Sequence, residues 1–463
     1  MSSPTKRGDG FGVALVAPLA LGSLLNPINS SMIATALGPI GRAFDASVSE
    51  TVWLIAALYV TSAVAQPTMG RLADRWGARR VFLGGLVLVL VGGIAGALAP
   101  TLRALVGVRV LIGIGTSAAY PSAMRVLRTH ARRVGRETPR SVLGVLSLAG
   151  LSSMAIGPTL GGFLTGAAGW RAIFLVNVPL AAMGIVLCLL FVESDEAVDP
   201  SEKAVRLDVV GIALFAGTIV STMFLAMDTK NGPRWSLVPV AGALFAGMIA
   251  HSLRRENAHP FLDLRMLVAN KPLSATYVRF SVTCVLSYLV LYGFAQWMET
   301  ALGYTPTEAG IATLPLSITS MVSTLVAART KTLRAPLTLA AFILLLGCGG
   351  LFLLNDHASR IGIGIVGILF GIAQGANSVA NQAAVYEQAP AEEIGTAAGL
   401  QRTAGYLGAV VASSLLAFFY GKQATTGGLH SLAVAMMVLS ALLCAGTALD
   451  PSLQSAKRTQ TST

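Results

Sequence analysis

The sequence predicts an all-α membrane protein with fourteen transmembrane helices, on the basis of three observations. Hydrophobic residues make up 54% of the 463 residues and charged residues 12%, which is too apolar for a water-soluble protein of this length. Apolar runs of about 20 residues, each long enough to cross a bilayer as a helix, recur along the whole chain. A helix also satisfies its own backbone hydrogen bonds in lipid, and the short alternating segments typical of a membrane barrel are not seen.

The apolar runs define the expected spans in order, and the seventh and eighth are only just long enough. They lie near residues 11–37, 50–69, 81–100, 104–127, 141–165, 171–192, 207–227, 235–253, 274–298, 308–328, 335–355, 361–386, 395–420 and 430–449.

Two polar stretches, at 193–206 and 254–271, separate the seventh and eighth spans from six spans on either side. This 6+2+6 pattern predicts an N-terminal six-helix bundle (1–192), a connecting segment with two extra transmembrane helices (193–271), and a C-terminal six-helix bundle with a cytoplasmic tail (272–463). Transporters built from two bundles bind their substrate near the midplane between the bundles.

The net charge of +12 could indicate a nucleic-acid-binding protein, but the distribution of Lys and Arg argues against it. With the N-terminus inside, 24 of the 33 basic residues fall in cytoplasmic segments, seven fall outside, and Arg109 and Arg402 lie within spans. This positive-inside bias predicts a multi-pass protein of the cytoplasmic membrane with both termini in the cytoplasm. The basic segments are then expected to contact anionic membrane lipids, and no nucleic acid is expected as a partner.

The stretch "GRLADRWGARR" (70–80) is expected to form a short cytoplasmic loop between the second and third spans. A basic loop that sets the topology explains its arginines, but leaves Asp74 and the glycines at 70 and 77 unexplained. Glycine permits a tight turn and a close approach of helix ends, and Asp74 can cap the next helix or pair with an arginine.

The order of these residues resembles the loop signature of the major facilitator superfamily, G-x-L-x-D-R-x-G-R-[RK]. In that family the loop acts as a conformational latch, and its Asp and Arg form a charge network that stabilises the outward-facing state. The resemblance assigns this role to Gly70, Asp74, Arg75, Gly77 and Arg79, and it implies the major facilitator fold.

"RVLIGIGTSAAYPSAMRVL" (109–127) resembles the fourth-span motif of the same family, R-x-x-Q-G-x-G, with Ile112 in place of the usual Gln. An arginine within a membrane span is costly, and Arg109 is therefore a candidate for a role in coupling. The alternative is that its long side chain reaches the nearby membrane surface.

"SMAIGPTLGGFL" (153–164) resembles the fifth-span motif of the family's exporters, G-x-x-x-G-P-x-x-G-G, with matches at Gly157, Pro158, Gly161 and Gly162. Such residues make a kinkable helix with a smooth face for close packing, which ordinary helix packing also explains. In the family this motif accompanies efflux more often than uptake.

"GWRAIFLVNVPLA" (169–181) is similar to a segment of the fourteen-span drug/proton antiporter branch, and stretches 259–267, 303–316 and 395–411 resemble later segments of that branch. The resemblance implies secondary-active efflux of hydrophobic or amphipathic compounds by alternating access, coupled to protons. Uptake or exchange of a specific metabolite, lipid transport and a non-transporting membrane sensor are the alternatives.

Members of the branch usually carry a buried Asp in the first span, where this chain has Asn29. Because Asn does not titrate, one expected coupling site is missing. Glu299, at the end of the ninth span, is a candidate replacement together with Arg109 and Arg402, although a solvated carboxylate at the outer interface is an equal alternative.

Polar residues within spans indicate where a substrate cavity lies. Five of them recur every three or four residues on one predicted helix, Gln374, Asn377, Ser378, Asn381 and Gln382. A single polar residue is equally explained by interhelical hydrogen bonding, whereas a stripe favours a cavity. The other candidates for this mostly apolar cavity are Asn29, Gln66, Tyr120, Tyr292 and Gln296.

The sequence gives no reason to expect an enzyme. It contains no Walker A motif, nucleophile motif or cluster of His and Cys, so neither ATP, a metal nor another cofactor is expected. The expected partners are a hydrophobic or amphipathic small molecule, membrane lipids and protons, and the chain is expected to be a monomer.

Overall fold

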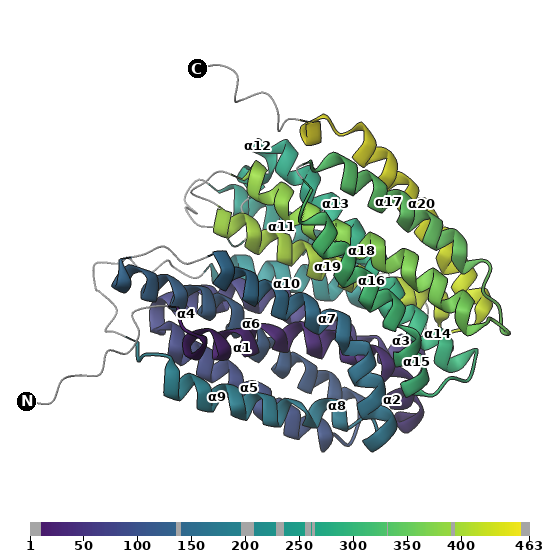
Figure 1. The fold of residues 1–463 in the computed structure, drawn as a ribbon, viewed down its shortest axis with the longest axis horizontal. Helices are drawn as coiled ribbons and strands as arrows, with labels where there is room; N and C mark the ends of the chain where they lie inside the picture. The colour runs from purple at the N-terminus through teal and green to yellow at the C-terminus, as the bar shows by residue number, and fades with distance from the viewer. Residues whose placement is uncertain are drawn as a thin grey trace, which may run out of the picture.

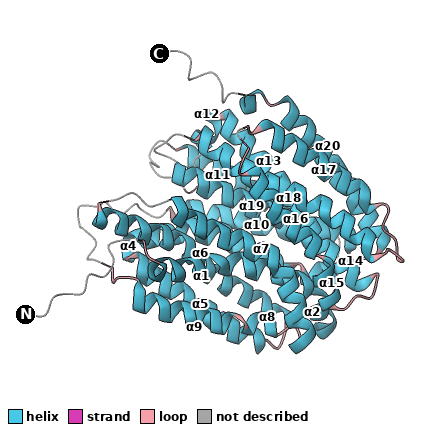
Figure 2. Ribbon diagram, in the orientation of Figure 1, coloured by secondary structure: helices cyan, strands magenta, loops and turns pink. Residues whose placement is uncertain are grey.

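The computed structural model describes residues 11–135, 140–195, 208–227, 236–254, 261, 264–330, 332–389 and 394–454. Within these ranges all regular structure is helical, which confirms the all-α prediction (Figure 2). The two termini predicted to be cytoplasmic, most of the polar stretch at 193–206 and part of that at 254–271 lie outside the described residues.

The N-terminal helices, called the N-half below, run from α1 to α9. They are α1 (Val13–Met32), the 3₁₀ turn η1 (Ile33–Thr35), α2 (Leu37–Phe44), α3 (Val48–Thr51), α4 (Trp53–Trp76), α5 (Ala78–Ala97), α6 (Leu102–Val134), α7 (Arg140–Ala168), α8 (Ala172–Leu175) and α9 (Asn177–Phe191). The connecting helices are α10 (Val209–Met227), α11 (Leu237–Leu253) and α12 (Leu264–Ala269).

The C-terminal helices, called the C-half, run from α13 to α20. They are α13 (Lys271–Tyr288), the π-helix η2 (Leu289–Phe294), α14 (Ala295–Thr300), α15 (Pro306–Ala312), α16 (Leu314–Ala327), α17 (Arg334–Leu351), α18 (Arg360–Gln388), α19 (Ile394–Tyr420) and α20 (Thr426–Leu449), followed by the 3₁₀ turn η4 (Pro451–Gln454).

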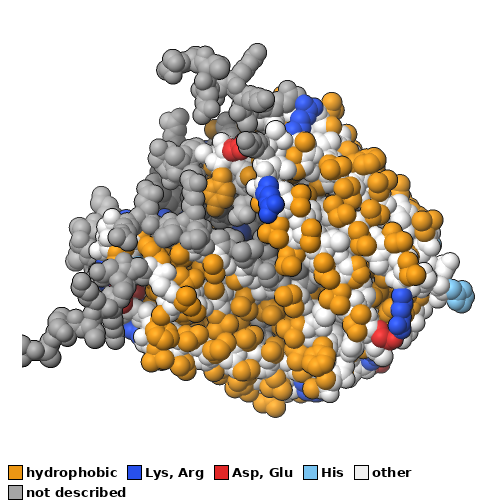
Figure 3. Space-filling view, in the orientation of Figure 1, with side chains coloured by type: hydrophobic (Ala, Val, Ile, Leu, Met, Phe, Trp, Pro, Cys, Tyr) orange, Lys and Arg blue, Asp and Glu red, His pale blue; other side chains and the backbone are white. Residues whose placement is uncertain are grey.

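Among the described residues, 11 helical segments are long and apolar enough to cross a membrane, and α10 and α11 are shorter apolar helices. The 29-residue α7 also coincides with a predicted span. Hydrophobic side chains cover most of the face seen in Figure 3. Large apolar residues such as Leu190, Phe418 and Leu442 are more than half exposed, as expected of a surface that contacts lipid.

The predicted loop at 70–80 is shorter than expected from the sequence. α4 continues to Trp76, and Gly77 alone forms the turn, with a φ of 98° that favours glycine. α5 begins at the next residue. The helix continues because Ala73 is fully buried in an apolar cluster with Val81 of α5 and Ala118 of α6.

The N-half and the C-half lie side by side, and they meet where α2, α3, α14 and α15 gather, on the right of Figure 1. We call this the closed end. Main-chain hydrogen bonds join the halves there, from Val48 N to Lys422 O (3.3 Å) and from Ser49 N to Gly421 O (3.0 Å). The opposite end, which carries the Asp74–Arg80 turn, is called the basic end.

The connecting helices α10 and α11 pack against each other and lie next to a contact between the halves. α10 contacts both α4 of the N-half and α19 of the C-half. The ring of Phe224 on α10 lies 4.7 Å from that of Trp53, at the start of α4.

Glycine at position 161 is expected to be essential for the packing of α7 on α1. A Cβ there would lie 2.3 Å from Met32 O, and a main-chain atom cannot move aside as a flexible side chain can. Gly161→Ala is therefore expected to destabilise the protein by about 1–3 kcal/mol, measured by unfolding the purified protein in detergent. Gly107→Ala on α6 is the control, since a Cβ there meets nothing within 4 Å. Equal stability of the two variants would contradict this packing.

Candidate functional site

A cavity of about 240 Å³ lies between the N-half and the C-half. Helices α1, α4, α6 and α7 form one wall, and α13, α18 and α19 form the other. Its lining residues are Gly22, Ser23, Asn26, Pro27, Ser30, Tyr59, Gln66, Thr116, Ser117, Tyr120, Leu146, Gly150, Phe280, Tyr288, Ser378, Gln382, Tyr386, Gln401, Arg402 and Tyr406. Small, hydroxyl, amide and aromatic side chains predominate, so the cavity has an amphipathic lining.

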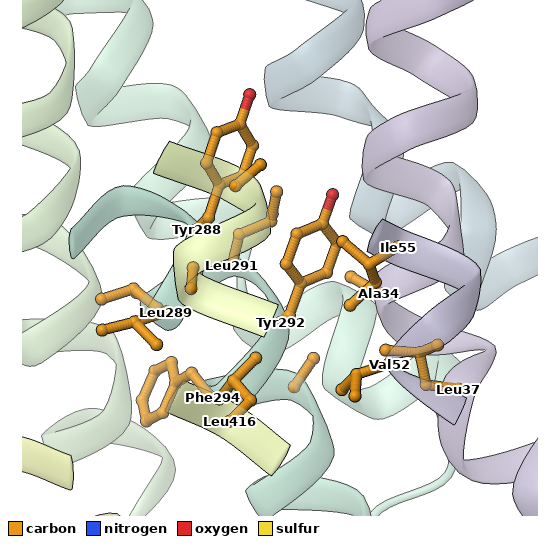
Figure 4. Packing of buried hydrophobic residues seen from close by; sticks show 14 of the residues in the cluster. Ala34, Leu37, Val52, Ile55, Tyr288, Leu289, Leu291, Tyr292, Phe294 and Leu416 are labelled. Carbon is orange, nitrogen blue, oxygen red and sulfur yellow. The ribbon is translucent and has the colours of Figure 1, made fainter. Parts of the chain in front are cut away.

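Tyrosines separate this cavity from the closed end. The rings of Tyr288 and Tyr292 stack with an interplanar angle of 8°, and their hydroxyls point the same way in Figure 4. The Tyr292 hydroxyl donates to Ser30 O (2.7 Å) on α1, which leaves the Tyr59 hydroxyl as the donor in its 3.0 Å bond to Tyr292. Because Tyr59 and Ser30 belong to the N-half and Tyr292 to the C-half, these bonds join the two halves between the cavity and the closed end.

The π-helix η2 begins directly after Tyr288 and contains Tyr292. It lies between α13 and α14, in a segment that the sequence presents as one continuous apolar span. A π-helical turn contains an additional residue and changes the register of the residues that follow, and such turns often occur at functional sites. Here Tyr288, just before the π-helix, lines the cavity, and Tyr292, within the π-helix, faces the contact between the halves.

Some polar groups of the cavity form hydrogen bonds with one another or with a neighbouring side chain. The Asn26 amide nitrogen donates to Ser62 and Thr116 hydroxyls, both at 3.0 Å. Across the cavity, the Tyr406 hydroxyl of α19 donates to Gln66 Oε1 of α4 at 2.7 Å. The cavity therefore contains fixed hydrogen-bonding groups in an otherwise apolar and aromatic setting.

Arg402 is the charged member of the lining residues. Its guanidinium carbon lies 3.5 Å from the centroid of the Tyr120 ring, so a cation–π contact bridges α19 and α6. Among the described lining residues there is no Asp or Glu. Arg402, predicted as a coupling candidate, is thus placed within the cavity itself.

The structure places the predicted cavity residues in two groups. Gln66, Tyr120, Ser378 and Gln382 line the cavity. The others lie outside its lining: Gln374 is half-buried, and those buried in helix packing are Asn29, Tyr292, Gln296, Asn377 and Asn381.

On α18 the polar stripe divides between two faces. Ser378, Gln382 and Tyr386 follow one another at four-residue intervals and face the cavity. Asn381 lies one position away from this row and accepts a hydrogen bond from Arg279 Nε of α13 (3.1 Å). Helical periodicity alone does not say which of two adjacent rows faces a space.

Asn29 forms a reciprocal amide pair with Asn177, at the start of α9. Asn29 Nδ2 donates to Asn177 Oδ1 (2.5 Å), and Asn177 Nδ2 donates to Asn29 Oδ1 (2.9 Å). Both side chains are buried. The position that carries an acid in the resembling branch is therefore a neutral contact between α1 and α9.

Arg109 is 1% exposed, so its side chain does not reach the membrane surface. Its Nε donates to Leu54 O (2.9 Å) and its Nη1 to Asn29 O (3.1 Å), which ties α6 to α4 and α1. Its Nη2 has no hydrogen-bond partner. Arg109 holds three helices of the N-half together as a cation supported by main-chain carbonyls.

Glu299, at the closed end, is 5% exposed, and neither carboxylate oxygen has a hydrogen-bond partner. It packs against Gly38 of α2, where an added Cβ would lie 2.3 Å from Glu299 Oε2 and 3.5 Å from Arg42 Nη1. The expectation of a solvated carboxylate at this position is therefore wrong for this state, because α2 covers the side chain.

At the basic end, Asp74 pairs with Arg125 of α6. Asp195, beyond α9, accepts hydrogen bonds from the main-chain nitrogens of Arg79 (2.9 Å) and Arg80 (3.0 Å), and so caps the first turn of α5. A Cβ on Gly77 would lie 2.3 Å from the Asp195 carboxyl group, so glycine is required beside this cap.

The remaining two predicted latch residues lie at the margin of this network. Arg75 is exposed, and Gly70 lies next to α6, where an added Cβ would be 3.6 Å from Pro121 Cβ. The cap from Asp195 could not be predicted from the sequence, because Asp195 lies more than 100 positions after Arg79 and Arg80.

The C-half has its own ion pair near the basic end, between Arg279 Nη1 of α13 and Asp450 Oδ2 after α20 (2.9 Å). Partial burial favours the neutral form of Asp450. Hydrogen bonds from Ser452 and from Arg279, with the Arg279 charge, outweigh that effect and lower the pKa of Asp450.

The fifth-span motif brings α7 against both halves at the closed end. Added Cβ atoms would lie 1.7 Å from Ser31 Oγ at Gly157 and 2.3 Å from Pro306 O at Gly162. Beside them, Pro158 O accepts a hydrogen bond from Thr35 (3.3 Å), and Thr307 donates to Gly162 O (3.1 Å). The small residues therefore serve the contact with α15 of the C-half as well as packing on α1.

The comparisons with known proteins find one superfamily and several transporters. The family model of the Major Facilitator Superfamily matches residues 19–413. The chain is 33% identical over 425 residues to the uncharacterized MFS-type transporter YwoD of Bacillus subtilis, covering 91% of this chain and 93% of that protein. It is 30% identical over 427 residues to the multidrug efflux pump LfrA of Mycolicibacterium smegmatis, covering 89% and 82%.

Among solved structures, a POT family transporter in complex with 5-aminolevulinic acid superposes with a TM-score of 0.67 at 14% identity, covering 93% of this chain and 96% of that one. At that identity the likeness concerns the fold alone. The all-helical architecture, the family match and these relatives agree with the expectation of a membrane transporter of small molecules rather than an enzyme. The chain belongs to the major facilitator superfamily.

Proposed function

We propose that this protein is a secondary-active exporter of hydrophobic or amphipathic compounds. The observation that carries the proposal is the cavity between the N-half and the C-half, which has an amphipathic lining drawn from both and is separated from the closed end by the Tyr292 contacts. Two halves that rock about such a cavity expose it to one side of the membrane at a time. The efflux function in LfrA's name and the exporter-like motif on α7 support this direction of transport.

The proposed membrane topology has fourteen spans, made up of the 11 long segments, α7, α10 and α11. The 6+2+6 division then places six spans in each half and the α10–α11 pair between them. Basic residues favour the cytoplasmic side, so the basic end and both termini are assigned to the cytoplasm.

In this orientation the structure is an inward-facing state. Several lining residues lie toward the basic ends of their helices, as Gln66 does on α4, Tyr386 on α18 and Arg402 on α19. The closed end is then the extracellular gate. The network around Asp74 holds the ends of α4, α5 and α6 together within the N-half, and its rearrangement would bias the exchange between states.

Proton coupling is proposed at Glu299. Its carboxyl group is buried between α2 and α14 without a hydrogen-bond donor, and the charged side chain near it is Arg42. An ionised carboxylate without donors is costly to bury, so the extracellular gate closes over Glu299 only after this side chain has taken up a proton from the outside. Net coupling then requires that the proton leave toward the cytoplasm before the gate opens again. A group that is alternately covered and hydrated in this way can link proton movement to the transport cycle.

The orientation can be tested by cysteine labelling. Lys422 at the closed end and Arg80 at the basic end are both exposed. In intact cells a membrane-impermeant maleimide is expected to label Lys422→Cys, and to label Arg80→Cys only after the membrane is opened. The parent protein, whose four native cysteines are buried or half-buried, gives the background. Labelling of Arg80→Cys in intact cells would overturn the assignment.

Transport through the cavity can be tested by filling it. Gly150 lines the cavity, and an added Cβ would be 3.8 Å from Pro27 Cγ, so Gly150→Trp can be accommodated and places an indole in the space. Wild-type protein in an efflux-deficient bacterium is expected to raise the inhibitory concentration of amphipathic compounds several-fold, and Gly150→Trp to remove this protection. The control is Gly107→Trp on the exposed face of α6. Full protection by Gly150→Trp would contradict the proposed pathway.

The coupling role of Glu299 can be tested in proteoliposomes with an imposed pH gradient. Glu299→Gln is expected to lose most of its gradient-driven transport while keeping substrate exchange without a gradient, because its side chain cannot release a proton. The matched control is Glu308→Gln on α15, since Glu308 is exposed and a glutamine preserves its capping contact with Thr305. Unchanged gradient-driven transport in Glu299→Gln would exclude this site.

A further inference from the structure

The charge of the cavity narrows the class of compound that it accepts. Arg402 is a cation within the lining, and no carboxylate is found among the lining residues that the structure describes. Glu387, which follows Tyr386 at the end of α18, is exposed and lies outside the lining. A cationic compound would therefore meet a like charge in the cavity and find no counterion there.

The setting of Arg402 leaves it able to bind an anion. Its guanidinium is stacked on the Tyr120 ring at 3.5 Å, and among the described residues no ion pair with a carboxylate is seen for it. Stacking occupies the face of a guanidinium, whereas its N–H donors lie in the plane and remain available for a bidentate contact with a carboxylate or similar anion.

A buried positive charge in the wall of the N-half also disfavours cations in the cavity. Arg109 is almost fully buried, is supported by main-chain carbonyls, and has an unpaired Nη2. The nearby position 29, where an acid could have balanced it, carries a neutral amide paired with Asn177. In a medium of low dielectric constant an uncompensated positive charge acts over a longer distance than it does in water.

We infer that the cavity binds amphipathic anions, with the acidic group of the compound held by Arg402 and its aromatic or apolar body against the tyrosine-rich floor. This inference rests on the proposed function, since it concerns the same cavity. The floor is the end of the cavity toward the closed end. It is formed by Tyr59 and Tyr288, whose rings lie 4.9 Å apart, and Phe280 lines the C-half wall beside Tyr288. A volume of about 240 Å³ suits a compound with one substituted aromatic ring.

The test uses three probes that share one hydrophobic body: 4-butylbenzoate, 4-butylbenzyl alcohol and 4-butylbenzylammonium. Binding to the full-length protein in nanodiscs of zwitterionic lipid is measured by calorimetry at neutral pH, with empty nanodiscs subtracted. Wild-type protein is expected to bind the benzoate about tenfold or more tighter than the ammonium compound, the size of effect given by one charge-assisted pair.

Arg402→Gln is expected to remove this preference and leave the affinity for the alcohol nearly unchanged, and Arg402→Lys to keep only part of it. The matched control is Arg360→Gln, because Arg360 also lies over a tyrosine ring, that of Tyr304 at 5.8 Å, but at an exposed position outside the cavity. A benzoate that binds no tighter than the ammonium compound, or a preference that survives Arg402→Gln, would overturn the inference.

Gly150→Trp distinguishes this inference from the proposed function. Loss of alcohol binding in that variant would support the cavity as the binding site for amphipathic molecules, whatever the outcome for charge. Binding of all three probes that persists in Gly150→Trp would contradict the cavity itself, and the inference with it.

Discussion

The closed end depends on main chains that approach one another without intervening side chains. On α7, Gly161 lies against Met32 O of α1, and the adjacent Gly162 lies against Pro306 O of α15. Helices in lipid gain little from the hydrophobic effect between them, so close packing and hydrogen bonds must hold them together. With α7 fixed between the two halves, the Thr307 bond to Gly162 and the Tyr292 bond to Ser30 fall within reach.

The cavity follows from the same arrangement, because two halves that converge at one end enclose a space farther along. Its chemistry departs from what the sequence resemblance implied. The branch carries an acid in the first span, whereas here Asn29 and Asn177 form a neutral pair and the buried carboxyl group is Glu299 at the closed end. The structure therefore has one cation, Arg109, buried in the wall of the N-half and another, Arg402, in the cavity.

Hydropathy placed most helices within a few residues of their observed positions, because the length of an apolar run is a local property of the sequence, but α4 and α6 each continue seven residues beyond the predicted end. The partners of individual side chains were not accessible in this way. Asn29 and Asn177 are separated by 148 positions, and only the fold brings their amides together. The π-helix at 289–294 gives no local signal in an apolar run, although it contains Tyr292, which joins the two halves. The resemblance identified Asp74 but not Arg125 as its partner.

The position of α10 has a consequence for molecules dissolved in the bilayer. One lateral junction between the halves, between α4 and α19, is backed by this helix, and the Trp53–Phe224 contact lies beside it. The other junction is formed by α7 with α15 and α16, whose Ile311, Ile318 and Met321 are exposed at the molecular surface. A lipophilic molecule dissolved in the bilayer therefore meets an asymmetric protein, with α10 covering the junction on one flank and apolar side chains of α15 and α16 exposed on the other.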